Sequence, residues 1–279
     1  MGNSRIISLI TIVLILVTGL GLWLSGGIET LGLRLFGPPE VEMAETYGVT
    51  GGVETYDHST YNQLVSTQVD SEGLVDYVGI GRHAAELDAY LTNLATANLD
   101  ILGRDERLAL LINAYNAFTL QLILDHLPVE SIRDIPSRER WDGERWVLAG
   151  RTYSLNQIEH ELIRPNFREP RIHFALVCAA IGCPPLRSEA YVGTQIERQL
   201  EDQALFVHGS ERWLRYERGN KTVEITALYQ WYAGDFEQIA GSVLEYLARY
   251  DDNLAADLLV GHRPKIRHLD YDWSLNTKP

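Results

Sequence analysis

The sequence contains only two cysteines among 279 residues, and the short motifs that most often identify an enzyme are missing. It has no glycine-rich phosphate loop, no Gly-x-Ser-x-Gly nucleophile turn and no His-Glu-x-x-His metal motif. No second pair of Cys or His stands at ligand spacing, which disfavours a zinc site. These absences exclude the commonest nucleotide-binding, serine-hydrolase and zinc-protease families, and we expect neither a metal nor a cofactor.

Basic residues are also scarce, since 24 Lys and Arg stand against 38 Asp and Glu and the formal net charge is -14. A surface this acidic repels phosphates, so we expect no nucleic-acid partner. With 46% hydrophobic and 9% aromatic residues, the composition is that of a globular protein rather than a disordered one. The substrate is therefore expected to be a small molecule or a peptide, and the sequence does not identify which.

Long apolar runs are limited to one, residues 6–24, which contain no charged side chain. At about 1.5 Å per residue, a helix of this length crosses a hydrocarbon core about 30 Å thick. No Ala-x-Ala pattern follows the run, which favours an uncleaved signal anchor over a cleaved secretory signal. Arg5 before the run and Glu29 after it favour an N-terminus on the inner side. We therefore predict a single-pass membrane protein with its C-terminal domain on the exported, periplasmic or extracytoplasmic side.

The rest of the chain divides by composition into a linker and one folded domain. Residues 1–5 form a short tail before the anchor, residues 25–55 are rich in Gly and Thr and typical of a linker, and residues 56–279 are predicted to form the globular domain. The patterns predict helices over 82–99, 105–127, 155–164, 194–208, 243–250 and 254–260, hairpins over 146–153 (turning at Ala149-Gly150) and 213–226, and a terminal strand or extended arm over 266–276. This mixture predicts an α+β fold, a helix-dominated single domain with short β-hairpins, preceded by one transmembrane helix.

Both cysteines lie in residues 171–186, an apolar stretch that also contains His173. Local geometry does not pair His173 with Cys178, because a strand points the two side chains to opposite faces and a helix separates them by about 140°. Cys178 and Cys183 are five residues apart around a Gly-containing bend, and three interpretations stay open. In an exported domain a disulfide is the simplest state, a reactive or catalytic thiol is the second, and two inert buried thiols are the third.

Two of the predicted helices carry polar side chains that are expected to be buried or near the buried edge. Asn113 and Asn116 lie in the middle of the helix predicted over 105–127, where an unpaired buried amide costs about 1–3 kcal/mol. We expect both to be buried and hydrogen-bonded, either as a structural clasp on a neighbouring loop or as the lining of a pocket. Glu159 is expected near the buried edge of its helix, whereas His160 is expected on a solvated face.

Six motifs, in order along the chain, complete the pattern: Asn113-Ala-Tyr-Asn116, Ser154-Leu-Asn-Gln-Ile-Glu159, Pro170-Arg-Ile-His-Phe-Ala-Leu-Val-Cys178, Cys183-Pro-Pro-Leu186, Ala190-Tyr191 and Tyr271-Asp-Trp-Ser-Leu-Asn276. Together they resemble the family known as DUF547, a domain of unknown function. The resemblance runs from about residue 60 to the C-terminus, and Val177 and Ala179-Ala180 depart from it where the family is associated with more polar residues. It implies a shared fold and a shared, unassigned site, and the family's name supplies no reaction.

Two functions are compatible with these residues. In the first, the protein is a membrane-tethered hydrolase or transferase of the thiol type, in which a base activates the thiol and a third group orients the base. Its candidate residues are Cys178 or Cys183 as nucleophile, His173 as base, Glu159 as the orienting group, and Asn113 or Asn116 as the substrate-binding amide that polarises a developing oxyanion. In the second, the domain is a noncatalytic binding or scaffold module in which a Cys178–Cys183 disulfide is a structural staple.

Overall fold

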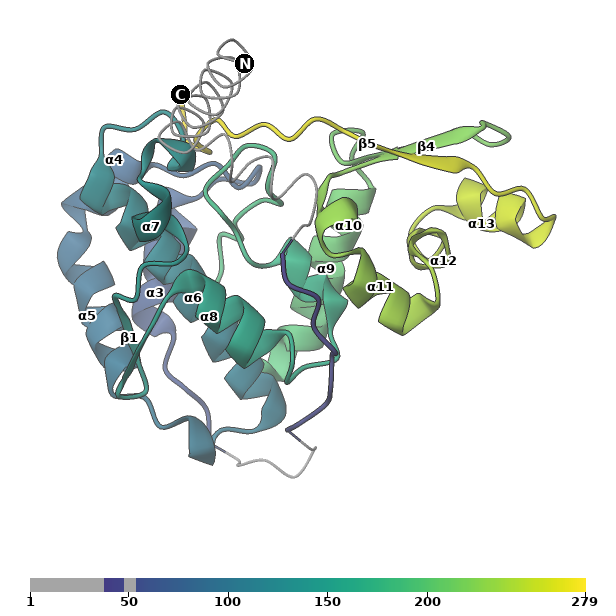
Figure 1. The fold of residues 1–279 in the computed structure, drawn as a ribbon. Coiled ribbons are helices and arrows are strands. Elements are labelled where there is room, and N and C mark those ends of the chain that lie inside the picture. The colour runs from purple at the N-terminus through teal and green to yellow at the C-terminus, as the bar shows by residue number, and fades with distance from the viewer. Residues whose placement is uncertain (1–37, 48–53) are drawn as a thin grey trace, which may run out of the picture. The chain divides into compact units, whose positions relative to one another are not determined.

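The computed structural model describes residues 38–47 and 54–279, and the chain falls into two compact units, Met1–Pro39 and Glu40–Pro279. The predicted tail at 1–5 and the predicted membrane anchor at 6–24 lie outside the described residues. The described helices and strands all belong to the second unit, which contains the predicted globular domain (Figure 1).

Helices dominate this unit, and its strands are short. The α-helices are α3 (Ser59–Gln68), α4 (Tyr77–Arg82), α5 (Ala84–Ala95), α6 (Arg104–His126), α7 (Ser137–Arg140), α8 (Leu155–Gln157), α9 (Ile196–His208), α10 (Leu228–Trp231), α11 (Ala233–Ala240), α12 (Val243–Leu247) and α13 (Asp252–Leu259). Short 3-10 helices are η1 (Leu99–Ile101), η2 (Ile132–Asp134), η4 (Pro170–Phe174) and η5 (Gly193–Gln195), and η3 (Ile158–Ile163) is a π-helix. The strands are β1 (Trp146–Leu148), β2 (Arg151–Tyr153), β3 (Leu214–Arg215), β4 (Thr222–Ile225) and β5 (Lys265–His268).

The strands form two small sheets. β1 and β2 make an antiparallel hairpin that turns at Ala149 and Gly150, both with positive φ, as the sequence predicts. β4 lies between β3, to which it is antiparallel, and β5, to which it is parallel. Because the helices and these sheets are not arranged as repeated βαβ units, the fold is α+β, in agreement with the predicted class.

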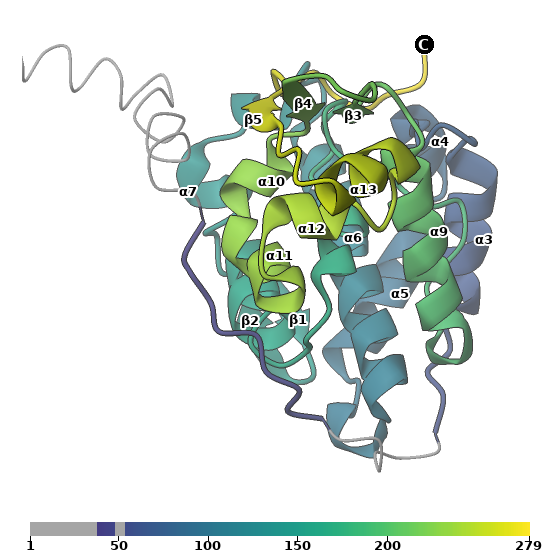
Figure 2. The same cartoon turned by 90° about the vertical axis from the view of Figure 1, so that its right-hand side faces the viewer.

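α6 is the central helix of the first hydrophobic core. Residues 108–120 of this helix are all buried, and it contacts α4, α5, α8 and α9. Figure 2 shows it inside the unit, with α3, α5 and α9 around it. Within the described ranges it is the one helix long and apolar enough to cross a membrane, but most of that apolar surface is buried in the unit. α6 is therefore a core helix of the globular domain.

A second hydrophobic core lies between α9, the sheet β3-β4-β5 and the helices α10 to α13. Tyr229 and Phe236 are among its buried aromatic residues. η4 lies between the two cores, since Ile172 belongs to the first and Phe174 to the second. His173 stands between them on the same short helix and is buried as well.

An extended N-terminal segment, residues 40–47, packs against this unit although it falls within the predicted linker. The backbone N–H of Met43, a buried residue, donates to Oε1 of Gln238 at 2.8 Å. The ring of Tyr47 packs against that of Phe167, with centroids 5.1 Å apart.

The C-terminal residues form both the strand and the extended arm that the sequence predicts. After β5 the chain continues as an arm over residues 269–279, which returns across the first core. The backbone N–H groups of Ile181 and Gly182 donate to the carbonyls of Ser274 and Asp272, at 2.8 and 2.7 Å. The arm thereby fixes the segment that carries both cysteines.

Candidate functional site

Both cysteines lie on a tight turn, residues 178–183, that follows η4. The turn is closed by a hydrogen bond from the N–H of Cys183 to the carbonyl of Ala180, 3.1 Å long. Ala179 has a φ of 59°, in the left-handed region, which costs a residue with a Cβ about 1–3 kcal/mol. Asn276 of the C-terminal arm stabilises this conformation by donating its N–H to the Ala179 carbonyl at 3.1 Å. The strained turn is therefore held by contacts from a distant part of the chain.

The two sulfur atoms are in contact but not bonded. Cys178 Sγ and Cys183 Sγ lie 3.0 Å apart, and both residues are free thiols. A disulfide bond is about 2.0 Å long, so the disulfide favoured from the sequence is absent from this structure. Its place is taken by hydrogen bonds, because the backbone N–H of Cys178 donates to Cys183 Sγ at 3.0 Å.

These hydrogen bonds make Cys183 the more acidic of the two thiols. Burial opposes ionisation of Cys183, but its sulfur accepts hydrogen bonds from the S–H and N–H of Cys178 and from Tyr271, and these lower its pKa. The hydrogen bond to Cys183, together with burial, raises the pKa of Cys178 well above its ordinary value. Cys183 is therefore the first of the two to lose its proton, Cys178 is the one that keeps it, and the pair titrates as a unit.

Tyr271 of the C-terminal arm completes the surroundings of the sulfurs. Its hydroxyl lies 3.1 Å from Cys178 Sγ, and its ring packs against those of Trp231 and Trp273, with centroids 4.8 and 4.6 Å away. Gly182 makes this approach possible, since a Cβ at that position would lie 3.0 Å from the Tyr271 ring. Burial and the two sulfurs raise the pKa of Tyr271 well above its ordinary value, so the hydroxyl keeps its proton and acts as a donor.

The π-helix η3 determines where Glu159 and its neighbours point. Its wider turn is marked by the hydrogen bond from the N–H of Arg164 to the carbonyl of Glu159, 2.9 Å long. Glu159 is buried, as expected, but the expectation of a solvated His160 is wrong. The His160 side chain is only 12% exposed, because the π-helix carries it inward against Glu159 and Arg164.

The carboxylate of Glu159 interacts with Tyr115 and Tyr232 and, in the described part of the chain, not with a histidine that contacts either cysteine. Burial and the neighbouring Glu159 carboxylate raise the pKa values of Tyr115 and Tyr232 well above the ordinary value. The same carboxylate opposes ionisation of Cys183. Glu159 therefore works against a thiolate at this site and does not orient a base toward it.

His173 is paired with a carboxylate instead of a thiol. Its Nε2 lies 2.8 Å from Oδ2 of Asp235, and its ring stacks on Tyr232 with centroids 3.7 Å apart. Arg164 donates from Nε and Nη2 to the two oxygens of the same carboxylate, each at 2.8 Å. Within the described residues no hydrogen bond joins His173 to either sulfur. The structure thus brings Cys178 and Cys183 together and leaves His173 in a separate buried ion network.

Burial opposes ionisation of Asp235, but the hydrogen bonds from Arg164 and His173 outweigh it and lower the pKa of Asp235 to about 2. The carboxylate therefore stays charged at neutral pH. Because a buried carboxylate needs such partners, this network holds α11 against η3 and η4.

Asn113 and Asn116 form the clasp that the sequence predicts as one of two alternatives. Asn113 donates from Nδ2 to the carbonyl of Tyr191 and accepts the N–H of Tyr191 at Oδ1, at 2.7 and 2.9 Å. Asn116 makes the equivalent pair with the carbonyl of Ala175 and the N–H of Val177, both at 2.9 Å. Both amides are buried, and each is joined to backbone on either side. Asn116 thereby fixes the chain just before Cys178.

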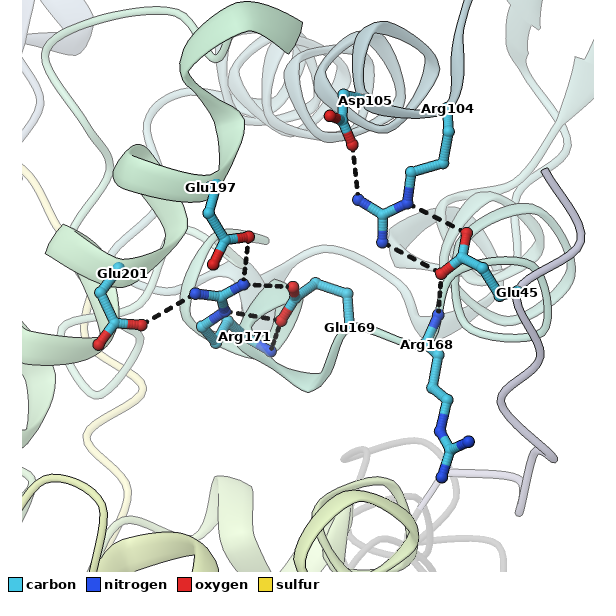
Figure 3. A network of polar contacts seen from close by, with 8 residues as sticks. All are labelled: Glu45, Arg104, Asp105, Arg168, Glu169, Arg171, Glu197 and Glu201. Carbon is cyan, nitrogen blue, oxygen red and sulfur yellow. Dashed lines mark hydrogen bonds and ion pairs between the residues drawn. The ribbon is translucent and has the colours of Figure 1, made fainter. Parts of the chain in front are cut away.

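A polar network on the other side of η4 fixes this helix against α9. Arg171 is bound by Glu169 from its own segment and by Glu197 and Glu201 of α9, at distances of 2.6 to 2.9 Å. Figure 3 shows these residues beside a second group of Glu45, Arg104, Asp105 and Arg168. A cavity of about 330 Å³ lies next to Arg171, and its lining includes Arg168, Glu169, Pro170, Arg171, Glu197, Glu201, Ile239, Tyr246, Arg249 and Tyr250.

Residues 38–47 and 54–279 contain no group of three His, Cys, Asp or Glu side chains placed to hold a metal ion. Sequence reasoning missed Tyr271 as a neighbour of the thiols and Asp235 as the partner of His173. Tyr271 begins one of the six motifs, and that position was a usable signal. Asp235 lies in none of them and gave no signal.

One comparison with known proteins gives a match, over part of the chain. The family model described as "Protein of unknown function, DUF547" matches residues 99–206, less than half of the sequence. This match supports the domain family indicated by the motifs, and it includes α6, η4 and the turn with both cysteines but not Tyr271 or Asp235. No curated protein and no solved structure matches the chain.

Proposed function

We propose that this protein is a membrane-tethered, thiol-dependent hydrolase or transferase whose globular domain lies on the exported side of the membrane. The observation that carries the proposal is the 3.0 Å contact between two free thiols, of which Cys183 accepts hydrogen bonds that favour a thiolate. Because the thiolate is the reactive form of cysteine and Cys183 can take the proton of Cys178, such a site needs no base outside the two cysteines.

Cys178 is the nucleophile in this proposal, because it is partly exposed whereas Cys183 is only 4% exposed. Cys183 is the base: its thiolate takes the S–H proton of Cys178 across the 3.0 Å contact as Cys178 attacks the substrate. Tyr271, 3.1 Å from Cys178 Sγ, protonates the leaving group and regains a proton from Cys183. An acyl group is thereby transferred to Cys178 and then to water or another acceptor, and the pair returns to its starting state.

In this proposal the other candidate residues from the sequence hold the backbone around the thiols in place and take no part in the reaction. His173 and Glu159 belong to the buried networks that hold η4 and η3, and Asn116 holds the chain before Cys178. Asn113 holds the neighbouring loop through Tyr191. None of these four side chains is proposed to touch the substrate.

A burst assay with p-nitrophenyl acetate tests the chemistry on the full-length protein in detergent. The wild type should release about one equivalent of nitrophenolate rapidly, as expected for an acyl-enzyme. Cys178→Ser should abolish the burst, and acetylation should be found on Cys178 by peptide mapping. A burst that persists in Cys178→Ser, or none in the folded and reduced wild type, contradicts the proposal.

The pH dependence of alkylation tests the roles of the neighbouring groups. The iodoacetamide rate of the wild type should titrate below about 8.5, the value for an unperturbed thiol. Tyr271→Phe should move that midpoint upward, because the hydrogen bonds of the Tyr271 hydroxyl lower the pKa of both thiols. Tyr153→Phe, in the β1–β2 hairpin, is the matched control and should leave it unchanged. Thiols that react only after unfolding would show that both cysteines are packing residues.

The membrane tether rests on the uncharged run 6–24. The full chain should remain in the membrane fraction after a carbonate wash, and added protease should reach the domain from the exported side. A mature N-terminus located after residue 24 would contradict the tether. So would a domain that resists protease in preparations whose exported face is accessible to the protease.

A further inference from the structure

The turn at residues 178–183 holds its two sulfurs in an arrangement that suits a second kind of chemistry. Their separation of 3.0 Å exceeds a disulfide bond by only about 1 Å. The hydrogen bonds from Ile181 and Gly182 to the C-terminal arm are made by backbone atoms alone and do not use the sulfurs. A small rotation of the two side chains therefore closes the bond without breaking the contacts that fix the turn.

We propose that Cys178 and Cys183 are a reversible redox couple that exchanges with an external disulfide, the chemical class of a small oxidised thiol such as glutathione disulfide. This activity goes beyond the proposed acyl transfer and does not depend on it, since acyl transfer uses one sulfur as nucleophile and redox exchange forms a bond between both. The predicted exported location is one in which disulfides form and persist.

The exchange has two steps, and the different exposure of the two residues sets their order. In the first, Cys178 attacks one sulfur of the external disulfide, its proton passes to Cys183, and one reduced thiol leaves after taking up a proton from solvent. In the second, Cys183 loses its proton and attacks Cys178 Sγ, which releases the second thiol. Counted from two neutral thiols, the cysteines lose two protons and two electrons, one proton leaving Cys183 before the first step and one before the second; the external disulfide gains the two electrons and takes up two protons from solvent.

The surroundings of the pair favour this order. Cys178 is the partly exposed residue of the pair and is therefore assigned as the one that meets the external disulfide, and the sulfur of the buried Cys183 lies 3.0 Å from its sulfur. The backbone N–H of Cys178 already points at Cys183 Sγ, at 3.0 Å, and stabilises the thiolate needed for the second step. Tyr271 donates to Cys178 Sγ and stabilises negative charge there when a reductant reopens the bond.

The experiment uses the reduced full-length protein in detergent, equilibrated with mixtures of glutathione and glutathione disulfide. Free thiols are blocked with a maleimide of known mass, and the intact mass gives the number of labels. The wild type should pass from two labels to none as the disulfide fraction rises, and should regain both when reduced glutathione is added in excess. Protein that keeps two labels in excess glutathione disulfide, or that links only between chains, would overturn the proposal.

Single variants test the order of the steps. Cys183→Ser should accumulate a glutathione adduct on Cys178 that lasts at least about tenfold longer than in the wild type, because no neighbouring thiol resolves it. Cys178→Ser should form an adduct at least about tenfold more slowly, because only the buried sulfur remains. Equal adduct rates in the two variants, with circular dichroism spectra like that of the wild type, would contradict the assigned order.

The two proposals fail separately in these assays. If the protein shows a nitrophenyl acetate burst but never forms the internal disulfide, only the redox proposal is refuted. If the internal disulfide forms reversibly but the protein shows no burst, only the acyl-transfer proposal is refuted. The oxidised wild type should show no burst, since Cys178 is then no longer a thiol.

Discussion

Replacing Asn116 by Ala removes the side chain that fixes the backbone just before Cys178. The amide donates to the carbonyl of Ala175 and accepts the N–H of Val177, both at 2.9 Å. Asn116 is only 2% exposed, so water does not replace the lost partners. The variant therefore leaves two buried backbone groups unpaired in the middle of the first core.

The expected loss of stability follows from those two groups. Each buried donor or acceptor left without a partner costs about 1–3 kcal/mol, which gives about 2–6 kcal/mol for the pair. Ala is the better helix former within α6 and offsets about 0.6 kcal/mol of this. We expect the free energy of unfolding to fall by about 1–5 kcal/mol, and the same reasoning applies to Asn113→Ala through Tyr191.

Denaturant unfolding followed by tryptophan fluorescence measures this change. Asn93→Ala is the matched control, because it makes the same substitution on the exposed face of α5 and should change the free energy by less than about 0.5 kcal/mol. Asn116→Ala and Asn113→Ala variants that both unfold within about 0.5 kcal/mol of the wild type would refute the clasp. Alkylation of Cys178 in the folded Asn116→Ala variant should also lose its single pH midpoint, because the turn is no longer held in one arrangement.

Two further predictions concern pH. Burial lowers the pKa of His208 to about 4, so the unfolded chain binds a proton that the folded chain does not, and stability should fall as the pH is lowered from about 6.5 to 4. His208→Gln should reduce that slope in acid titrations of the unfolding free energy, and an unchanged slope would contradict the assignment. Asp235 has its pKa lowered to about 2, so its stabilisation is present above pH of about 4 and is lost as the pH falls toward 2. Asp235→Asn should abolish this second loss and destabilise the protein at neutral pH by about 3–5 kcal/mol, because it removes the charge of Asp235 from its buried ion pair with Arg164. A variant as stable as the wild type at pH 7 would argue against the ion network.

Local sequence patterns were sufficient for much of the fold. α6 was predicted within a residue at each end, because its apolar side chains continue around most of the helix and Pro128 stops it. The hairpin turn at Ala149 and Gly150 was predicted as well, since it depends on residues that are adjacent in the chain. In the same way, two asparagines inside an apolar helix implied buried hydrogen bonds before their partners were known.

The chemistry of the site was decided by contacts that no local pattern contains. His173 and Asp235 are 62 residues apart, and Cys178 and Tyr271 are 93 apart, so neither pair follows from helical or strand periodicity. The sequence by itself determined that two thiols and an imidazole lie in one apolar stretch. Only the tertiary structure decided that the imidazole faces a carboxylate and the thiols face each other, because packing of η4 between two cores turns His173 and the cysteine turn toward different partners.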